Sequence, residues 1–237
     1  TYEEVGHTQE AKKELIRRVN FQETENVLNS VKPPRLLRRI LQVGTDSDNG
    51  DIVLDFFAGS APLAQATLQQ NREDGGDRRF ICVQFPEPLP QEEENLETVA
   101  DLGKARTRDF VAELEEDESE LGFEESEDYK EDLGFRVWRL DESNYRNWSG
   151  VEDKDAEELE DEMELFTDPL KPGWDAEEVI WEVALKEGYS LSSQIEQTEL
   201  SENNTVYRVE DEEQDQSFLI CLDDELNDEI AAELELN

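Results

Sequence analysis

Apolar residues follow two different periods along the first part of the chain. Residues 51–57 form a short β-branched and aromatic run, which is typical of a strand covered on both faces. Residues 36–41 follow a proline pair with leucine and isoleucine at helical spacing, and Gly44 closes this segment. Residues 80–85 repeat the strand pattern, and residues 93–115 carry apolar side chains on one helical face. The pattern therefore predicts alternating helices and strands.

The order of these elements indicates a parallel sheet. A polar amphipathic helix over residues 8–18 precedes them, and residues 133–141 follow as a third strand. Helix, strand, helix, strand, helix, strand with right-handed crossovers is half of a doubly wound sheet. We therefore expect an α/β fold with three parallel strands. The acidic run at residues 115–132 is expected to be a solvated loop.

The composition and the predicted elements of the sequence change near Gly150. We expect a first domain at residues 1–148, an acidic linker at 149–173 and a small α+β domain at 174–237. The elements expected in the last domain are a helix over 175–186 with Asp175 as its cap, an antiparallel pair at 204–211 and 217–223, and a helix over 225–236. This domain carries no catalytic constellation, so binding or assembly is its expected task.

The charge of the chain is extreme. It has 22 basic and 64 acidic residues and a net charge of -42, yet its apolar runs are regular, which argues against disorder. An acidic surface on a patterned core predicts a halophilic protein from a cytoplasm with molar salt, where the screening length is only ~3 Å. The first 110 residues hold 14 basic and 20 acidic residues, so they are the better candidate for meeting nucleic acid. In molar salt, however, counterion release contributes little to such binding.

Several function classes are disfavoured. Cys82 and Cys221 lie in apolar strand-like runs without C-x-x-C spacing, which favours core thiols over a metal site or a disulfide. His7 is the only histidine, and a surface or capping role is expected for it rather than a place in a catalytic triad. No stretch approaches the ~18 apolar residues of a membrane span, and the first residues lack the apolar centre of a signal peptide. We therefore expect a cytoplasmic protein.

The candidate ligand site is the small-residue turn A-G-S-A at residues 58–61. Pro62 pre-sets the next helix, and Ala61 is its natural cap. In an open α/β sheet ligands bind at such a turn, although a plain strand-to-helix connection without a ligand would show the same sequence pattern. A dinucleotide fingerprint is disfavoured because only Gly59 is present and position 79 is an arginine, and no Lys-Ser or Lys-Thr follows for a Walker loop.

The turn resembles the F-x-G-x-G motif that follows an aspartate and holds S-adenosylmethionine in amino-methylating DNA methyltransferases, with Ala61 in place of the second glycine. The segments "GHTQEA", "VKPPRLLRRILQVGT", "DIVLDFFAGSA", "DGGDRRFICVQFPEP", "DLGKARTR" and "DLGFRVWRLDESNYRNW" also occur in the order found in the methylation (Mod) subunit of type III restriction-modification systems. "FLICLDDEL" resembles the carboxyl-terminal region of that family. The resemblance implies a DNA adenine-N6 methyltransferase, with half of a Rossmann-like class I methyltransferase sheet followed by the small α+β domain.

The resemblance also implies a site for S-adenosylmethionine, and the cysteine spacing gives no reason to expect a metal. The residues carried over are Lys32, Pro33, Asp55, Phe57, Gly59, Ser60, Gln84 and Glu87. An aspartate at the end of a strand can accept from the ammonium group of the cofactor, and a glycine admits close approach of the backbone. Gln84 stands where many methyltransferases have an acid, which predicts a weaker bond to the ribose hydroxyls. Packing in the core is the alternative role for Phe57.

Two features depart from the family. The chain reads "GSAPL" at residues 59–63 where the family usually reads G-S-G-T-T, so Ala61 adds a Cβ, Pro62 removes an amide donor and Leu63 removes a hydroxyl. The D-P-P-Y tetrapeptide that holds the flipped adenine is absent, and "TDPL" at residues 167–170 has neither the second proline nor the tyrosine. In this family that motif and the target-recognition segment precede the cofactor motifs, so we expect the chain to start after both.

Three hypotheses follow. In the first, the chain is the cofactor-side half of a Mod subunit, it is inactive until a D-P-P-Y half or a second Mod subunit docks, and its first strand has an exposed edge without that half. The partners then implied are DNA, through the complete subunit, and a restriction subunit that carries a helicase. In the second, the chain is a non-enzymatic remnant or assembly module of such a system. The third, an unrelated α/β enzyme with another nucleotide, leaves the ordered segments unexplained.

Overall fold

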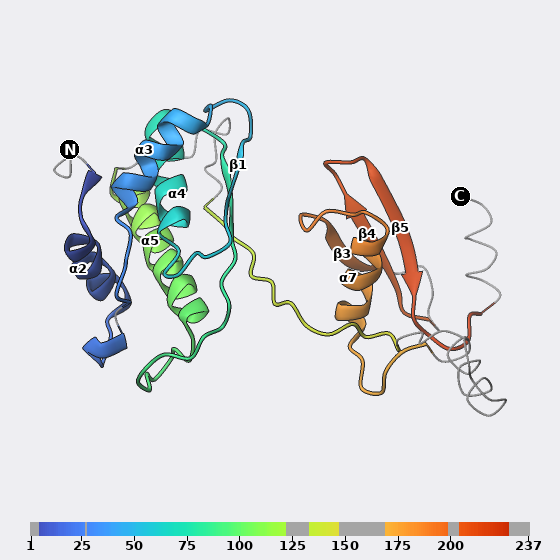
Figure 1. Ribbon diagram of the computed structural model, residues 1–237. Helices are drawn as coiled ribbons and strands as arrows, with labels where there is room; N and C mark the ends of the chain where they lie inside the picture. The colour runs from blue at the N-terminus through green and yellow to red at the C-terminus, as the bar shows by residue number, and fades with distance from the viewer. Residues whose placement is uncertain (1–4, 27, 122–132, 147–168, 199–203, 228–237) are drawn as a thin grey trace, which may run out of the picture. The chain divides into compact units, whose positions relative to one another are not determined.

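The structure is a computed structural model that describes residues 5–26, 28–121, 133–146, 169–198 and 204–227. It divides into two compact units, Thr1–Val137 and Trp138–Asn237 (Figure 1). Most of the expected acidic linker lies outside the described residues, as does the expected last helix from residue 228 onward. The domain boundaries expected from the sequence therefore remain predictions. None of the helices among the described residues is both long enough and apolar enough to span a membrane.

The described part of the first unit starts with helices α2 (Thr8–Val19) and α3 (Pro34–Gly44), which are joined through the short 3-10 turn η1 (Thr24–Asn26). Helix α2 starts after His7, which is exposed at the N-cap position, as the sequence predicts. Helix α3 starts on a proline, whose missing N–H would have no partner in the first turn of a helix. Both helices agree with the apolar spacing of the sequence.

Among the described residues of this unit, two short strands form a parallel sheet. Strand β1 (Ile52–Asp55) and strand β2 (Arg79–Cys82) pair in parallel, and helix α4 (Pro62–Asp74) connects them. Ala61 is the N-cap of α4, as predicted, and its backbone is left-handed with φ 52° and ψ 46°. The strand–turn–helix–strand order read from the sequence is therefore confirmed.

The long helix begins later than the sequence indicated. Helix α5 spans Val99–Leu121, whereas apolar spacing had suggested a start near residue 93. The start is set by Thr98 and Asp101, because the Thr98 N–H donates to the Asp101 carboxylate at 2.9 Å and the Asp101 N–H donates to Thr98 Oγ1 at 3.2 Å. The helix also continues into the acidic run that was expected to be a loop, and residues 122–132 of that run lie outside the described residues.

The expected third parallel strand is wrong. Residues 133–141 are described, but they form no strand, and the parallel sheet of the described residues has two strands. A strand exists only where a neighbouring backbone pairs with it, and apolar composition alone supplies no such neighbour. The boundary between the two units also falls inside this run, after Val137.

Helices α3 and α4 cover one face of the sheet (Figure 1). The buried cluster between them and the strands contains Leu41, Leu63 and Ala66, with Leu37, Val53 and Cys82 packed against it. A second cluster joins α4 and α5 to β2 through Leu68, Phe110, Leu114, Leu133 and Phe80. Helix α2 packs against α5 through Ala11, Leu15 and Leu102. These contacts fix the strands and their turns on one layer of helices.

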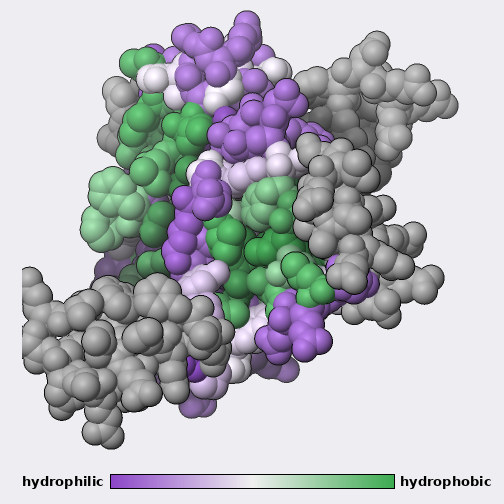
Figure 2. All heavy atoms as spheres, turned by 90° about the vertical axis from the view of Figure 1, so that its right-hand side faces the viewer, coloured by the Kyte–Doolittle hydropathy of each residue, from purple (hydrophilic) through white to green (hydrophobic). Residues whose placement is uncertain are grey.

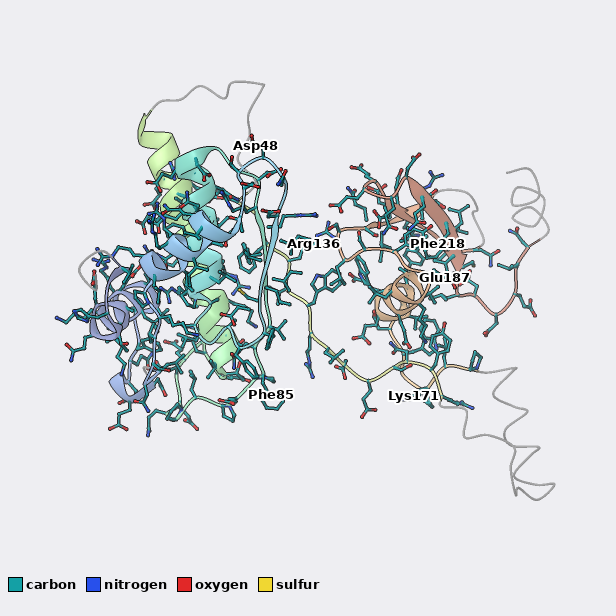
Figure 3. The ribbon with its side chains drawn as sticks, turned by 45° about the horizontal axis from the view of Figure 1, so that its top comes forward. Asp48, Phe85, Arg136, Lys171, Glu187 and Phe218 are labelled. Carbon is teal, nitrogen blue, oxygen red and sulfur yellow. The ribbon has the colours of Figure 1, made fainter. Side chains whose placement is uncertain are left out.

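The opposite face of the sheet is apolar, and no described residue of the first unit covers it. Successive side chains of a strand alternate between its two faces, and those that point away from α3 and α4 are 47–73% exposed: Ile52, Leu54, Phe56, Ile81, Val83 and Phe85. Phe85 is labelled in Figure 3, just beyond β2 at the margin of its unit. Figure 2 shows that hydrophobic side chains also gather into patches on the side of the molecule that it draws. Parallel strands are normally covered on both faces, so the uncovered sheet face is a core surface without its second layer.

The described residues of the second unit form a three-stranded antiparallel sheet with one helix. Its strands are β3 (Gln194–Thr198), β4 (Val206–Asp211) and β5 (Gln216–Cys221), in the order β3-β4-β5. Helix α7 (Ala176–Lys186) packs on the sheet, and its cap Asp175 accepts from two backbone N–H groups, as predicted. The pair β4 and β5 also agrees with the sequence, whereas β3 was missed.

The core of this unit lies between α7 and the sheet. Ile180 and Ala184 of the helix meet Val209 of β4, and all three are fully buried. Phe218, labelled in Figure 3, meets the ring of Tyr189 edge-on with their centroids 4.8 Å apart. This small α+β unit therefore has a hydrophobic core of its own.

Candidate cofactor site

The turn after β1 is tied to the end of β2. The Val83 N–H donates to the Asp55 carbonyl at 2.8 Å, and the Ala58 N–H donates to the Val83 carbonyl at 3.1 Å. The Gly59 N–H donates to the Gln84 Oε1 at 2.7 Å. The carboxyl ends of both strands and the turn thus form one continuous edge, which is the place where open α/β sheets bind ligands.

Asp55 and Phe57 lie at this edge with groups available to a ligand. The Asp55 Oδ1 accepts from the Phe57 N–H at 3.0 Å, which fixes the carboxylate over the start of the turn. Among the described residues, the other carboxylate oxygen accepts no hydrogen bond. The Phe57 side chain is 79% exposed, so its alternative role in the core is wrong.

Gly59 and Ala61 both have left-handed backbone, with φ 55° and 52°. Glycine adopts this conformation without strain, whereas an alanine pays roughly 1–2 kcal/mol for it. Helix α5 comes close to both residues at Gly103, where an added Cβ would lie 3.3 Å from the Ala61 Cβ and 3.3 Å from the Gly59 carbonyl oxygen. The turn is therefore held in a strained shape against α5.

Ser60 points away from the open edge. Its side chain is only 3% exposed, and its Oγ accepts from the Arg106 Nη1 at 3.0 Å. The hydroxyl is thus occupied inside the protein, and only the backbone of Ser60 remains beside the turn. The sequence could not reveal this, because it does not say to which side a turn residue points.

The structure does not join the remaining predicted residues to the turn through their side chains. Pro33 is buried at the N-cap of α3, and Lys32 before it is exposed. Leu28 leads into this segment and lies close to the turn, because a Cβ on Gly59 would be 3.7 Å from its Cδ1. Glu87 is exposed in the segment after β2. Among the described residues, no hydrogen bond or ion pair links the side chain of Lys32 or of Glu87 to the turn.

Two residues of α5 that were not predicted from the sequence, Gly103 and Arg106, pack against the turn. Arg106 is fully buried, and its Nε donates to the Gln65 Oε1 at 3.0 Å while its Nη1 holds Ser60. Burial lowers the pKa of the Arg106 guanidinium to about 10. Gly103 and Arg106 are three residues apart and share a helical face. Both stand in the segment "DLGKARTR", which the resemblance had already singled out.

Cys82 ends β2 opposite Asp55. Burial, with a smaller contribution from the Asp55 carboxylate, raises the pKa of the Cys82 thiol to about 11. The thiol is therefore neutral at ordinary pH and a poor nucleophile. Within the part of the chain that the structure describes, no group of three histidine, cysteine or acidic side chains is arranged to hold a metal ion.

The chain was also compared with known protein families. Residues 4–134 match the model of a family described as DNA methylase. Because the match spans more than half of the chain, the chain belongs to the DNA methylase family. The predicted kinship with methylation subunits is thereby confirmed at the level of the family.

Two curated relatives are Mod subunits. The chain is 31% identical over 130 residues to the type III restriction-modification enzyme StyLTI Mod subunit of Salmonella typhimurium, which is 52% of this chain and 19% of the relative. It is 45% identical over 58 residues to the type III restriction-modification enzyme EcoPI Mod subunit of Escherichia phage P1, which is 24% of this chain and 9% of that relative. The chain thus matches less than a fifth of the length of either relative.

Proposed function

We propose that this chain is the cofactor-binding half of a site-specific DNA adenine-N6 methyltransferase of the Mod type, and that S-adenosylmethionine binds at the turn after β1. One observation carries the proposal: Asp55, Phe57, Gly59 and Gln84 converge at the carboxyl edge of the sheet, in a chain that belongs to the DNA methylase family. When bound, S-adenosylmethionine supplies the methyl group that is transferred to the amino nitrogen of adenine.

The residues of the edge fit the cofactor in part. The second carboxylate oxygen of Asp55 suits an ammonium donor, and the exposed Phe57 ring offers an apolar surface. Gln84 Oε1 already accepts from Gly59, and its second lone pair can take one hydroxyl. Ser60 contributes no hydroxyl, because Arg106 holds it, and Pro62 has no amide N–H to give.

We assign the base-holding step to another segment, because no D-P-P-Y tetrapeptide occurs in the 237 residues. A polypeptide that carries this motif docks on the uncovered sheet face defined above. Three observations support this occupant: parallel sheets are covered on both faces, the uncovered face runs up to Phe56 beside the cofactor edge, and both relatives are much longer than the matched region. DNA and a restriction subunit are then partners of the complete cytoplasmic assembly.

A calorimetric titration of the full chain with S-adenosylmethionine in molar KCl tests the cofactor site. We expect the wild type to bind and Asp55→Asn to lose at least tenfold in affinity. The matched control is Asp51→Asn, just before the other end of β1, where the carboxylate accepts from the Asp46 N–H at 2.8 Å. This control should bind like the wild type. Equal losses in both variants, or no binding by a folded wild type, would refute the cofactor site.

The second candidate is a non-enzymatic assembly module. It is favoured by the altered "GSAPL" turn, where a proline stands at position 62 and the Ser60 hydroxyl is taken by Arg106. The second unit, with its own core and no catalytic constellation in the sequence, would then be the part that binds a partner. The same titration separates the two candidates, because only a cofactor-binding half requires an open site at Asp55.

A further inference from the structure

Arg106 is a buried cation without a direct carboxylate partner among the described residues. It is the largest fully buried side chain of the described part, and its Nη2 has no hydrogen-bond partner there. The carboxylate of Glu14 is reached only through an amide, because the Gln65 Nε2 donates to the Glu14 Oε1 at 2.7 Å while the Gln65 Oε1 accepts from Arg106. Burying a charge in this way opposes folding, so the side chain is expected to have a task.

The contacts of α5 point to that task. Arg106 donates to the Ser60 hydroxyl, and Gly103, one turn earlier on the same face, lies against the Gly59 carbonyl and the Ala61 Cβ. One face of α5 thus touches three successive residues of the turn. These are the residues in which the backbone turns left-handed twice, once at an alanine that resists this conformation.

We propose that Arg106 is a positioning residue for S-adenosylmethionine. Its hydrogen bond to Ser60 holds the strained turn in the shape that presents the Gly59 backbone beside Asp55. A charged donor is suited to this, because it forms a stronger hydrogen bond than a neutral one. This role rests on the cofactor site proposed above, but the effect on the turn does not depend on a bound cofactor.

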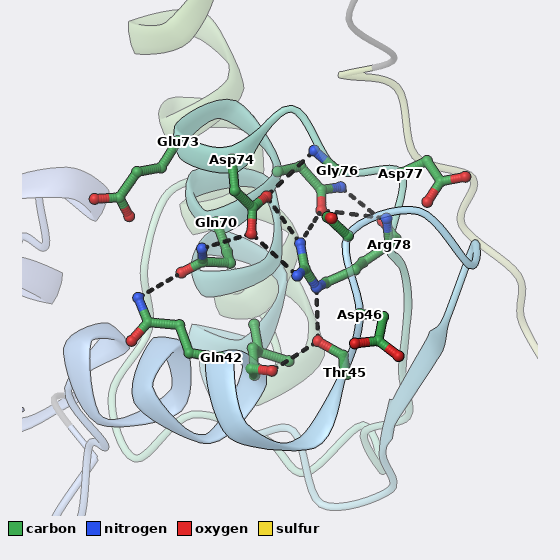
Figure 4. Close-up of polar contacts among 12 residues, drawn as sticks. Gln42, Thr45, Asp46, Gln70, Glu73, Asp74, Gly76, Asp77 and Arg78 are labelled. Atoms are coloured by element: carbon green, nitrogen blue, oxygen red, sulfur yellow. Dashed lines mark hydrogen bonds and ion pairs between the residues drawn. The ribbon is translucent and has the colours of Figure 1, made fainter.

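Arg78 provides the matched control, because it is a second buried arginine whose side chain also bonds to a residue of α4. It holds the other end of α4, where its Nη1 pairs with Asp74 at 3.0 Å and its Nε donates to the Thr45 Oγ1 at 2.6 Å (Figure 4). It is 5% exposed. None of its hydrogen bonds to the described residues reaches the turn, so its loss should weaken the fold without loosening residues 58–61.

The test is amide hydrogen exchange of a peptide spanning residues 56–63, measured on the full chain in molar KCl without cofactor. We expect Arg106→Met to raise the exchange rate at least tenfold and Arg78→Met to leave it within twofold of the wild type. Arg106→Lys, which keeps the charge and one donor, should restore most of the protection. Titration with S-adenosylmethionine should show the same ranking, with about a tenfold loss for Arg106→Met.

The outcomes separate the two proposals. If the wild type binds no S-adenosylmethionine, the proposed function fails, and the exchange data alone decide the role of Arg106. Equal exchange rates in Arg106→Met and Arg78→Met, or no rescue by Arg106→Lys, would overturn the positioning role. If Arg106→Met does not fold, Ser60→Ala replaces it, since that change removes the acceptor alone; unchanged exchange in Ser60→Ala would also overturn the role.

Discussion

The Gly59 amide donates to the Gln84 side chain at 2.7 Å, so a residue shortly after β2 holds the turn that follows β1. The other end of the same side chain is also fixed, because the Gln84 Nε2 donates to the Phe85 carbonyl at 3.0 Å. A carboxylate at this position could accept from Gly59 but could not donate to Phe85. The glutamine therefore braces the turn after β1 through its Oε1, while the bond from its Nε2 to the neighbouring Phe85 carbonyl fixes the orientation of its amide.

Replacing Gln84 by leucine should weaken the binding of S-adenosylmethionine. The change leaves the Gly59 N–H without its partner, and a hydrogen bond contributes about 0.5–1.5 kcal/mol, so affinity should fall roughly two- to tenfold. Calorimetry in molar KCl measures it. Gln69→Leu, the same change on α4 away from the turn, should leave affinity as in the wild type. A Gln84→Leu protein that binds as tightly as the wild type would contradict the brace.

Replacing Ala61 by glycine should stabilise the first unit. Relief of the left-handed alanine stabilises the fold by roughly 1–2 kcal/mol. Glycine also raises the entropy of the unfolded chain, which destabilises the fold by about 0.4–1 kcal/mol. The net gain should be about 0.5–1 kcal/mol in urea unfolding followed by circular dichroism. Ala64→Gly, inside α4, should change stability in the opposite direction by about 1 kcal/mol. Two changes of the same sign would show that the turn is not strained.

A charge on the uncovered sheet face should be tolerated. Leu54 is 55% exposed, so Leu54→Lys should change the free energy of unfolding by no more than about 0.5 kcal/mol. It should also lower the fluorescence of a dye that binds apolar surface. Val53→Lys, the neighbouring change on the face that packs against α3 and α4, should prevent folding. If Leu54→Lys were as damaging as Val53→Lys, the face would not be open to solvent.

The second unit should lose stability in acid through Asp211. The backbone N–H of Ser190, with further donors, lowers the pKa of the Asp211 carboxyl to about 2. A folded-state pKa below the ordinary value stabilises the fold above about pH 4, and this contribution is lost as the pH falls toward 2. Asp211→Asn should flatten that dependence. Glu182, with a pKa lowered to about 2 chiefly by hydrogen bonds from Lys186 and Ser143, should leave a residual slope of the same sign.

Tryptophan fluorescence measures this transition in the second unit alone, because all four tryptophans of the chain follow Val137. Unfolding midpoints in urea at pH 3 and pH 6 give the comparison. The control is Asp215→Asn, a change of the same kind between β4 and β5, where the pH dependence should stay as in the wild type. An unaltered pH dependence in Asp211→Asn would rule out this carboxylate as the cause.

The sequence located elements well where an apolar period coincided with a cap. The helices that begin at Pro34, Pro62 and Ala176 each combine both signals, and the strands on either side of α4 are short apolar runs. Apolar spacing alone was misleading near residue 93, because the exchange of hydrogen bonds between Thr98 and Asp101 decides where α5 begins. Residues 133–141 have strand composition, but a strand also needs a partner.

The site was predictable to the extent that it depends on the ends of strands. Asp55 and Gln84 follow from the element order, because parallel strands place their carboxyl ends at one edge. The inward turn of Ser60 and the role of Arg106 did not follow, since they depend on which way two side chains point. β3 was missed because Ile195 is the only apolar residue in its five positions.

The uncovered sheet face affects whether copies of this chain associate. The exposed apolar sheet faces of two copies attract each other, whereas the net charge of -42 on each copy makes the copies repel each other. That repulsion reaches about 10 Å in 0.1 M salt and only about 3 Å in 1 M salt. Ionic strength therefore sets the balance: dilute buffer keeps the copies dispersed, and concentrated salt lets the bare faces stick together.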